Sequence, residues 1–103
     1  MPTGRGGGSF GAADRYAAMV AATQHRWDEA EQLFESAIAL ESRMRSPVFL
    51  SISRLWYGRM LLNRDTEDQR ARAQELLQLA QTAAIAIGLT LVEREANQLL
   101  QSR

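Results

Sequence analysis

The amino-acid sequence predicts an all-α protein, built from two stacked antiparallel helix-turn-helix hairpins and a C-terminal capping helix. From residue 10 onward, apolar residues recur at the three- and four-residue spacing of helices, and no stretch shows the alternation of a strand. Proline and glycine stand where helices commonly begin and end. A pattern of small and large apolar residues also occurs twice, as an internal repeat would.

The 103 residues suffice for one small domain. Residues 1–9 are rich in glycine and have little to bury, so we expect a flexible tail there. The domain then comprises residues 10–103. It divides into a first hairpin at 11–44, a second hairpin at 47–88 and the capping helix at 90–101.

The first hairpin is predicted to contain one helix over about residues 12 to 24 and another from Trp27 or Asp28 onward. The apolar face expected for the first helix consists of Ala13, Ala17, Val20 and Ala21. The second helix opens with acidic residues, which suit the positive end of the helix dipole. Its apolar stripe has amphipathic spacing and consists of Ala30, Leu33, Phe34, Ala37 and Ile38.

The second hairpin opens with Ser46 and Pro47, an N-cap residue followed by proline at the first helical position. This helix is expected to reach about residue 63. Its apolar residues spread around much of the circumference, which predicts contacts on more than one side. They are Phe49, Ile52, Leu55, Trp56, Met60 and Leu62.

The last two helices carry start and stop signals of their own. Thr66 and Gln69 have the spacing of a capping box, and Gly88 is well placed to end that helix in a left-handed conformation. Thr90 and Glu93 form a second capping box, which opens the capping helix.

The internal repeat consists of two triplets of the form small, large, small. The first is Ala30, Phe34 and Ala37, and the second, 43 residues later, is Ala73, Leu77 and Ala80. Alanine lets neighbouring backbones approach closely, while the bulky residue fills the space between them. We therefore expect both triplets to be buried between paired helices.

These hairpins resemble the tetratricopeptide repeat, a helix-turn-helix unit that stacks into a superhelix. Ala18 and Gly58 fall where that family has a small residue in its first helix. The chain departs from the family pattern at His25, where glycine is common in the turn. The resemblance implies that the first helix of each unit lines a concave face that receives a partner segment.

The second unit, from Ser46 to Leu89, looks like the repeats at the carboxyl end of large bacterial signal-transducing ATPases, cyclases and transcriptional activators. A proline-containing segment precedes its first helix, and a charged turn leads into a helix that ends near glycine. By resemblance, the chain would be a bacterial domain that receives a regulatory signal or partner. It carries neither the catalytic nor the DNA-binding portion of such proteins.

The sequence offers little for catalysis. It has no cysteine, and its one histidine, His25, is expected in a solvated turn without an obvious partner. The carboxylates of Glu31, Glu35 and Glu41 lack the Glu-x-x-His pairs of a di-iron bundle. We therefore expect a protein that is not an enzyme and that holds no cofactor and no metal.

The charge and hydropathy of the chain limit its partners. Twelve basic residues balance twelve acidic ones, so neither a nucleic-acid ligand nor an anionic membrane is expected. No apolar run is long enough to cross a bilayer, and the first residues lack the apolar core of a secretory signal. These features predict a cytoplasmic protein. Trp27, Trp56 and Tyr57, which could stack on bases, are expected to serve in buried packing instead.

Acidic and basic residues are unevenly distributed along the chain. Residues 27–42 contain five acids and no arginine, whereas residues 43–72 contain seven arginines and three acids. One interpretation is a basic groove for an acidic peptide, read by Arg54 and Arg59. The other is that the charges keep the two hairpins soluble and attract one another weakly.

The expected function is that of a scaffold that binds a protein or peptide segment in the concave groove. Counted from Gly58 by the pattern of the resembled family, the groove residues that the resemblance implies are Ile52, Leu55, Arg59 and Leu62 from the second unit, with Arg15, Met19 and Ala22 as weaker equivalents from the first. The alternative is self-association as a homodimer, because two repeats leave apolar ends uncovered. Those ends are Phe10, Val20, Leu99 and Leu100.

Overall fold

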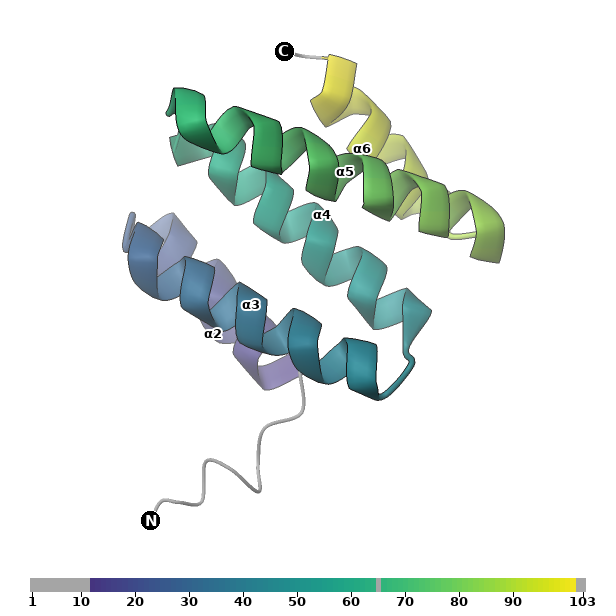
Figure 1. Ribbon diagram of the computed structural model, residues 1–103, viewed down its shortest axis with the longest axis horizontal. Helices are drawn as coiled ribbons and strands as arrows, with labels where there is room; N and C mark the ends of the chain where they lie inside the picture. The colour runs from purple at the N-terminus through teal and green to yellow at the C-terminus, as the bar shows by residue number, and fades with distance from the viewer. Residues whose placement is uncertain (1–11, 65, 102–103) are drawn as a thin grey trace.

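A computed structural model of the chain describes residues 12–64 and 66–101 (Figure 1). This part contains only α-helices, which confirms the all-α prediction. The helices are α2 (Ala12–Thr23), α3 (Trp27–Arg43), α4 (Pro47–Arg64), α5 (Glu67–Ile87) and α6 (Thr90–Gln101). Their ends lie close to the predicted positions. The predicted tail at residues 1–9 and the apolar end at Phe10 lie outside the described residues.

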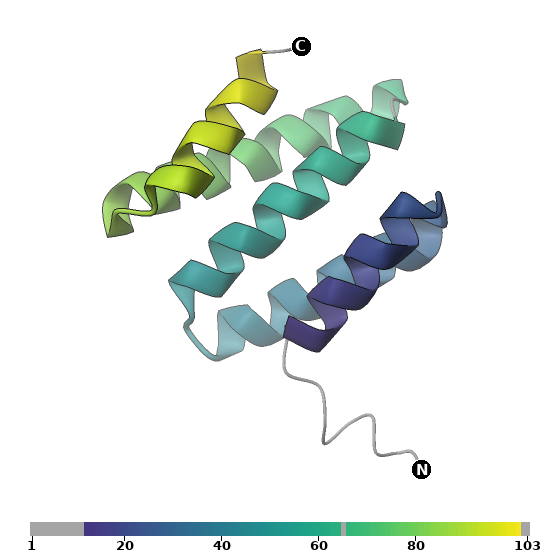
Figure 2. The ribbon, with the colours of Figure 1, turned by 180° about the vertical axis from the view of Figure 1, so that it is seen from behind.

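The helices lie in two layers (Figures 1 and 2). One layer consists of α2, α4 and α6, and the other of α3 and α5. Consecutive helices run antiparallel, as short turns require. Helix α4 is central and contacts each of the other four helices. The breadth of its apolar surface, noted in the sequence, follows from this position.

Three helix ends share one backbone turn, in which an N–H donates to the carbonyl five residues earlier. The donor–acceptor pairs are Arg26–Ala21 at 2.9 Å, Ser46–Glu41 at 3.1 Å and Leu89–Ala84 at 2.8 Å. The residue before each donor is left-handed: His25 has φ of 60°, Arg45 of 53° and Gly88 of 79°. The prediction for Gly88 is confirmed. His25, at the position where glycine is common in the resembled family, has this left-handed backbone.

The two predicted capping boxes differ from the observed helix starts. Thr66 has the extended backbone of an N-cap, but its side chain makes no capping hydrogen bond. At α6, the N–H of Glu93 donates to the carbonyl of Leu89 at 3.0 Å. Leu89 therefore occupies the capping position that was predicted for Thr90, because the helix begins one residue earlier.

Both small-large-small triplets are buried as predicted, with no member more than 1% exposed. Ala30, Phe34 and Ala37 lie on α3, which packs against α2 and α4. The second triplet lies on α5, which packs against α4 and α6. The repeat in the sequence thus corresponds to a repeated packing position in the fold.

The predicted apolar face of α2 is wrong in part. Ala21 is buried, but Ala17 is exposed and Val20 is 51% exposed, and the side chain of Ala13 lies outside the described residues. The buried face instead contains Ala18 and Ala21, together with Asp14 and Arg15. The ion pair that Arg15 makes inside the protein explains this orientation, because it turns Arg15 inward and leaves Val20 on the outer face of α2.

Helices α4 and α5 approach closely at Gly58. A Cβ atom at this position would lie 2.8 Å from Cγ and 2.9 Å from Cδ2 of Leu77, whose side chain is fully buried. It would also lie 3.3 Å from the carbonyl oxygen of Ala73. Glycine is therefore needed because there is no room for a side chain. Backbone conformation does not require it, since Gly58 lies in an ordinary stretch of helix.

We predict that Gly58→Ala destabilises the protein although alanine favours a helix. The propensity gain of about 1 kcal/mol is outweighed by overpacking of about 1 to 3 kcal/mol. Urea unfolding should show a net loss of up to about 2 kcal/mol. The control is the same change in a Leu77→Ala background, where space is available and the substitution should no longer destabilise. Equal losses in both backgrounds would contradict the assignment.

A candidate partner-binding surface

An apolar hollow of about 560 Å³ lies between α2 and α4 and reaches α3. This volume is within the range of ligand-binding clefts. Its lining comes from the end of α2, the turn at His25, the start and middle of α3, and the second half of α4. The lining residues are Met19, Ala22, Thr23, His25, Trp27, Phe34, Trp56, Arg59, Met60 and Asn63.

The aromatic lining of this first hollow is held by stacking. The rings of His25 and Trp27 lie 4.9 Å apart and nearly parallel. The guanidinium carbon of Arg59 lies 4.9 Å from the ring centre of Trp56, a cation–π contact. Arg59 is the one arginine among the described lining residues, which include no aspartate or glutamate, so the hollow is apolar with a guanidinium at its edge.

A second, smaller hollow of about 240 Å³ lies between α4 and α6. It is lined by Ile52, Leu55, Trp56, Leu91, Val92 and Glu95. Trp56 lines both hollows, so they adjoin each other across α4. Arg59 and Glu95 stand between them as an ion pair at 3.9 Å, too long for a hydrogen bond.

The structure distributes the predicted groove residues over both hollows and the core. Met19, Ala22 and Arg59 line the first hollow, whereas Ile52 and Leu55 line the second. Leu62 and Arg15 lie elsewhere: Leu62 is 4% exposed in the hydrophobic core, and Arg15 is 6% exposed and ion-paired.

Sequence reasoning missed the aromatic part of this surface. Trp27 and Trp56 were expected in buried packing, but both are half-buried and line a hollow. Met60 and Asn63 were also missed. The available signal for this surface was that apolar residues spread around much of the circumference of α4. They indicated more apolar surface than one neighbouring helix could cover.

Arg15 forms a buried ion pair with Glu41 of α3 at 2.7 Å. The same nitrogen of Arg15 lies 3.4 Å from the hydroxyl oxygen of Ser53 on α4, and Phe49 lies against its guanidinium, with the ring centre at 5.5 Å. Burial raises the pKa of Glu41, whereas Ser53 and Arg15 oppose this shift. The pair ties α2, α3 and α4 together, so Arg15 is a structural residue of the first hairpin.

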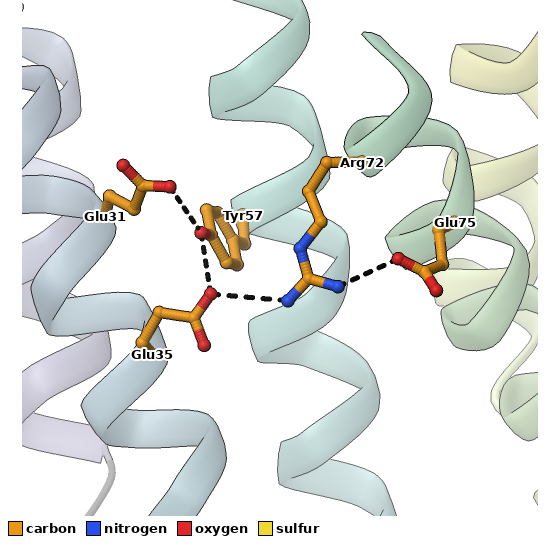
Figure 3. Close-up of polar contacts among 5 residues, drawn as sticks. All are labelled: Glu31, Glu35, Tyr57, Arg72 and Glu75. Atoms are coloured by element: carbon orange, nitrogen blue, oxygen red, sulfur yellow. Dashed lines mark hydrogen bonds and ion pairs between the residues drawn. The ribbon is translucent and has the colours of Figure 1, made fainter. Parts of the chain in front are cut away.

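Tyr57 connects the two hairpins on the side of α4 that faces α3 (Figure 3). Its ring is fully buried and stacks on Phe34, with ring centres 5.3 Å apart. Its hydroxyl donates to Glu35 at 2.8 Å or to Glu31 at 3.0 Å, both on α3. Burial raises the pKa of Tyr57 well above its ordinary value, and the two carboxylates raise it further.

The acidic residues of α3 also pair with arginines of the second hairpin. Arg72 on α5 reaches Glu35 at 3.3 Å and Glu75 at 2.9 Å (Figure 3). Arg64 at the end of α4 lies 3.3 Å from Asp28 and 3.8 Å from Glu31. These contacts favour mutual attraction of the hairpins as the reason for the uneven charge distribution.

Arg54 lies away from the hollows, although the sequence suggested that it and Arg59 could read an acidic partner. Burial lowers the pKa of Arg54, and the nearby charge of Arg72 lowers it further. Arg72, the residue whose charge Arg54 senses, lies on α5, in the layer formed by α3 and α5. Of the two arginines, only Arg59 is placed to contact a molecule on the surface formed by α2, α4 and α6.

Comparisons of the chain with protein-family models, with curated proteins and with solved structures found no match. The resemblance to the tetratricopeptide repeat therefore rests on the residues of this chain. Within the described residues, no group of three or more histidine, aspartate or glutamate side chains could hold a metal ion. None of the described helices combines the length and apolar character needed to span a bilayer.

We predict that stability falls above pH 10 because of Tyr57. An unfolded tyrosine loses its proton near pH 10, whereas the folded protein keeps it, so the unfolded state then binds fewer protons. The free energy of unfolding should fall by up to about 1.4 kcal/mol per pH unit. The range above pH 10 suits this measurement because the chain has no lysine to titrate in it and arginine ordinarily stays protonated.

The measurement is urea unfolding at several pH values between neutrality and about pH 11.5, below the ordinary titration of arginine. Tyr57→Phe should lose this pH dependence, whereas Tyr16→Phe, which replaces an exposed tyrosine, should keep it. Phenolate absorbance of the folded protein provides a second readout, since Tyr57 should contribute none near pH 10. A phenolate signal from Tyr57 in the folded protein at that pH would refute the assignment.

Proposed function

We propose that this protein is a non-enzymatic interaction module that binds a segment of a protein partner on the surface formed by α2, α4 and α6. The observation that carries the proposal is the first hollow, which leaves both tryptophans of the chain half-exposed. Exposed apolar clefts with polar edges are typical of interaction sites. The hollow is built on packed helices, which suits a preformed binding site.

The neighbour relations of the helices support a tetratricopeptide-like arrangement. Helix α4 contacts both helices of the first hairpin, and α6 contacts both α4 and α5. Consecutive hairpins of a helical solenoid pack in this way, with the first helices in one layer. Together with the resemblance of the second unit, this supports a regulatory role as the receiver of a partner or signal for a bacterial effector.

His25 supports a binding role over a catalytic one. It is exposed, and its ring is occupied by stacking on Trp27. A general base would need to be oriented by a hydrogen-bonding partner toward a substrate. In this protein His25 serves as one wall of the hollow.

A random-peptide library selected on the protein tests this function. We expect it to yield ligands that alter the fluorescence of the two tryptophans. Ala22→Phe, which fills the first hollow, should abolish their binding. The matched control is Ala86→Phe, at an exposed position on α5 in the other layer, which should leave binding intact. Failure to select any ligand, or equal binding to both variants, would overturn the proposal.

Self-association is a second candidate function, favoured by exposed apolar side chains at both open sides of the described helices. Tyr16 and Val20 project from one face of α2 and are 64% and 51% exposed, and Leu91 on α6 is 67% exposed. Leu99 and Leu100, which the sequence also suggested, are half-buried against the core. A dimer covering α2 would bury Tyr16 and Val20 together.

Light scattering over a range of protein concentrations tests self-association. If α2 forms the interface, the dimer should dissociate in Val20→Glu, because the new carboxylate would be desolvated there. Gln78→Glu, at an exposed position of α5, introduces the same charge elsewhere and should have no effect. A strict monomer at the highest concentration would exclude this candidate.

A further inference from the structure

We propose that the surface binds an acidic, extended peptide segment of the pattern apolar-x-acidic-x-apolar, which crosses α4 with one apolar side chain in each hollow. This inference rests on the proposed function and specifies the partner's chemistry. It follows from three features of the surface: two adjoining apolar hollows, their separation, and the single arginine between them.

The two hollows favour a chain over a compact molecule. They open on the same face of α4, one toward α2 and the other toward α6, and they share Trp56, so an occupant of both must pass over this helix. The second hollow is small, which suits one side chain. A segment that places one side chain in each gains two anchors from a single backbone.

The separation of the hollows determines the spacing of the two anchors. Their α4 residues are centred about five positions apart, or roughly 8 Å along the helix axis. Because one hollow lies between α4 and α2 and the other between α4 and α6, their centres are also offset sideways by roughly 8 to 10 Å, one distance between packed helices. The hollows are therefore roughly 12 Å apart. Residues i and i+4 of an extended chain are separated by roughly 13 Å and face the same side.

The charge of Arg59, between the two hollows, indicates which residue the peptide should carry between its two apolar anchors. In an extended chain, residue i+2 faces the same side as both anchors. It would lie over the region of Arg59, which is 38% exposed and in long contact with Glu95 at 3.9 Å. A carboxylate of the partner can accept the hydrogen bonds that this contact leaves unmade. Glu95 then opposes the same carboxylate, so it limits affinity.

The test uses a synthetic peptide, acetyl-Gly-Ser-Leu-Ser-Asp-Ser-Phe-Ser-Gly-amide, and follows the fluorescence of Trp27 and Trp56. Its control has the same composition, acetyl-Gly-Ser-Leu-Asp-Ser-Ser-Phe-Ser-Gly-amide, with the acid moved to the opposite face of the extended chain. We expect the first peptide to bind about fivefold more tightly, as a half-exposed ion pair contributes up to about 1 kcal/mol. Equal affinities would overturn the acidic middle position.

Two variants of the protein test the role of the charges. Arg59→Gln should weaken the first peptide about fivefold and leave the control peptide unchanged. Glu95→Gln should strengthen the first peptide a few-fold, because a competing carboxylate is removed. Arg54→Gln removes the same charge from α4 away from the hollows and should change neither affinity. A loss in Arg54→Gln as large as that in Arg59→Gln would contradict the proposal.

The peptide library separates this inference from the proposed function. Enrichment of the spaced pattern, dependent on Arg59, supports both. Enrichment of peptides of another pattern that compete for the first hollow overturns the inference and leaves the proposed function intact. A tryptophan spectrum that changes with protein concentration, with no response to any peptide, assigns the surface to a second copy of the chain and overturns both.

Discussion

The structure depends on the burial of α4 by all four other helices. An ordinary surface helix buries one stripe, but α4 has buried residues around most of its circumference, from Ser51 to Leu62. A helix enclosed in this way needs small residues where its neighbours come closest. Gly58 provides the clearest case, because even one methyl group would overlap the buried side chain of Leu77. The small residues of α4 thus permit the contact between α4 and α5, on which the two-layer arrangement rests.

Enclosing α4 also buries hydroxyl groups, and those of Tyr57 and Ser53 meet charged side chains of α3 and α2. The Tyr57 hydroxyl meets Glu35 and Glu31, while the Ser53 hydroxyl lies near the Arg15–Glu41 pair. Buried ion pairs contribute little net stability, because desolvation offsets their attraction, but removing one partner is costly. Such pairs therefore favour one register of the helices over others. Here they hold α3 against α2 and α4 at two points along its length, and the alanines of α3 permit the close approach that these contacts require.

Much of the fold was predictable because its signals are local. Pro47 and Gly88 act through backbone geometry alone, and both appear at the helix ends that they predicted. The alanine triplets were predictable because their spacing matches the helical period. The face of α2 was not, since alanine is abundant on all sides of this helix and gives no contrast. What orients α2 is Arg15, and its partner Glu41 lies 26 residues away. The same limit applied to the binding surface. The position of Arg59 followed from the family pattern counted from Gly58, but Trp27 and Trp56 meet in one hollow only through tertiary packing.

The charge network and the apolar hollow are connected through Phe34. This side chain forms part of the hollow's lining and stacks on Tyr57, whose hydroxyl is held by the acids of α3 (Figure 3). One wall of the hollow is therefore packed against Tyr57, the residue that the acids of α3 hold. Arg64 and Arg72 face those acids, so their charges are already compensated by the protein itself. Arg59 differs, because its ion pair with Glu95 is long and lies at the edge of the hollow. The protein thus uses Arg64 and Arg72 to join its two hairpins and leaves Arg59 beside its half-exposed tryptophans. This is why a partner should be recognised by a single carboxylate among apolar contacts.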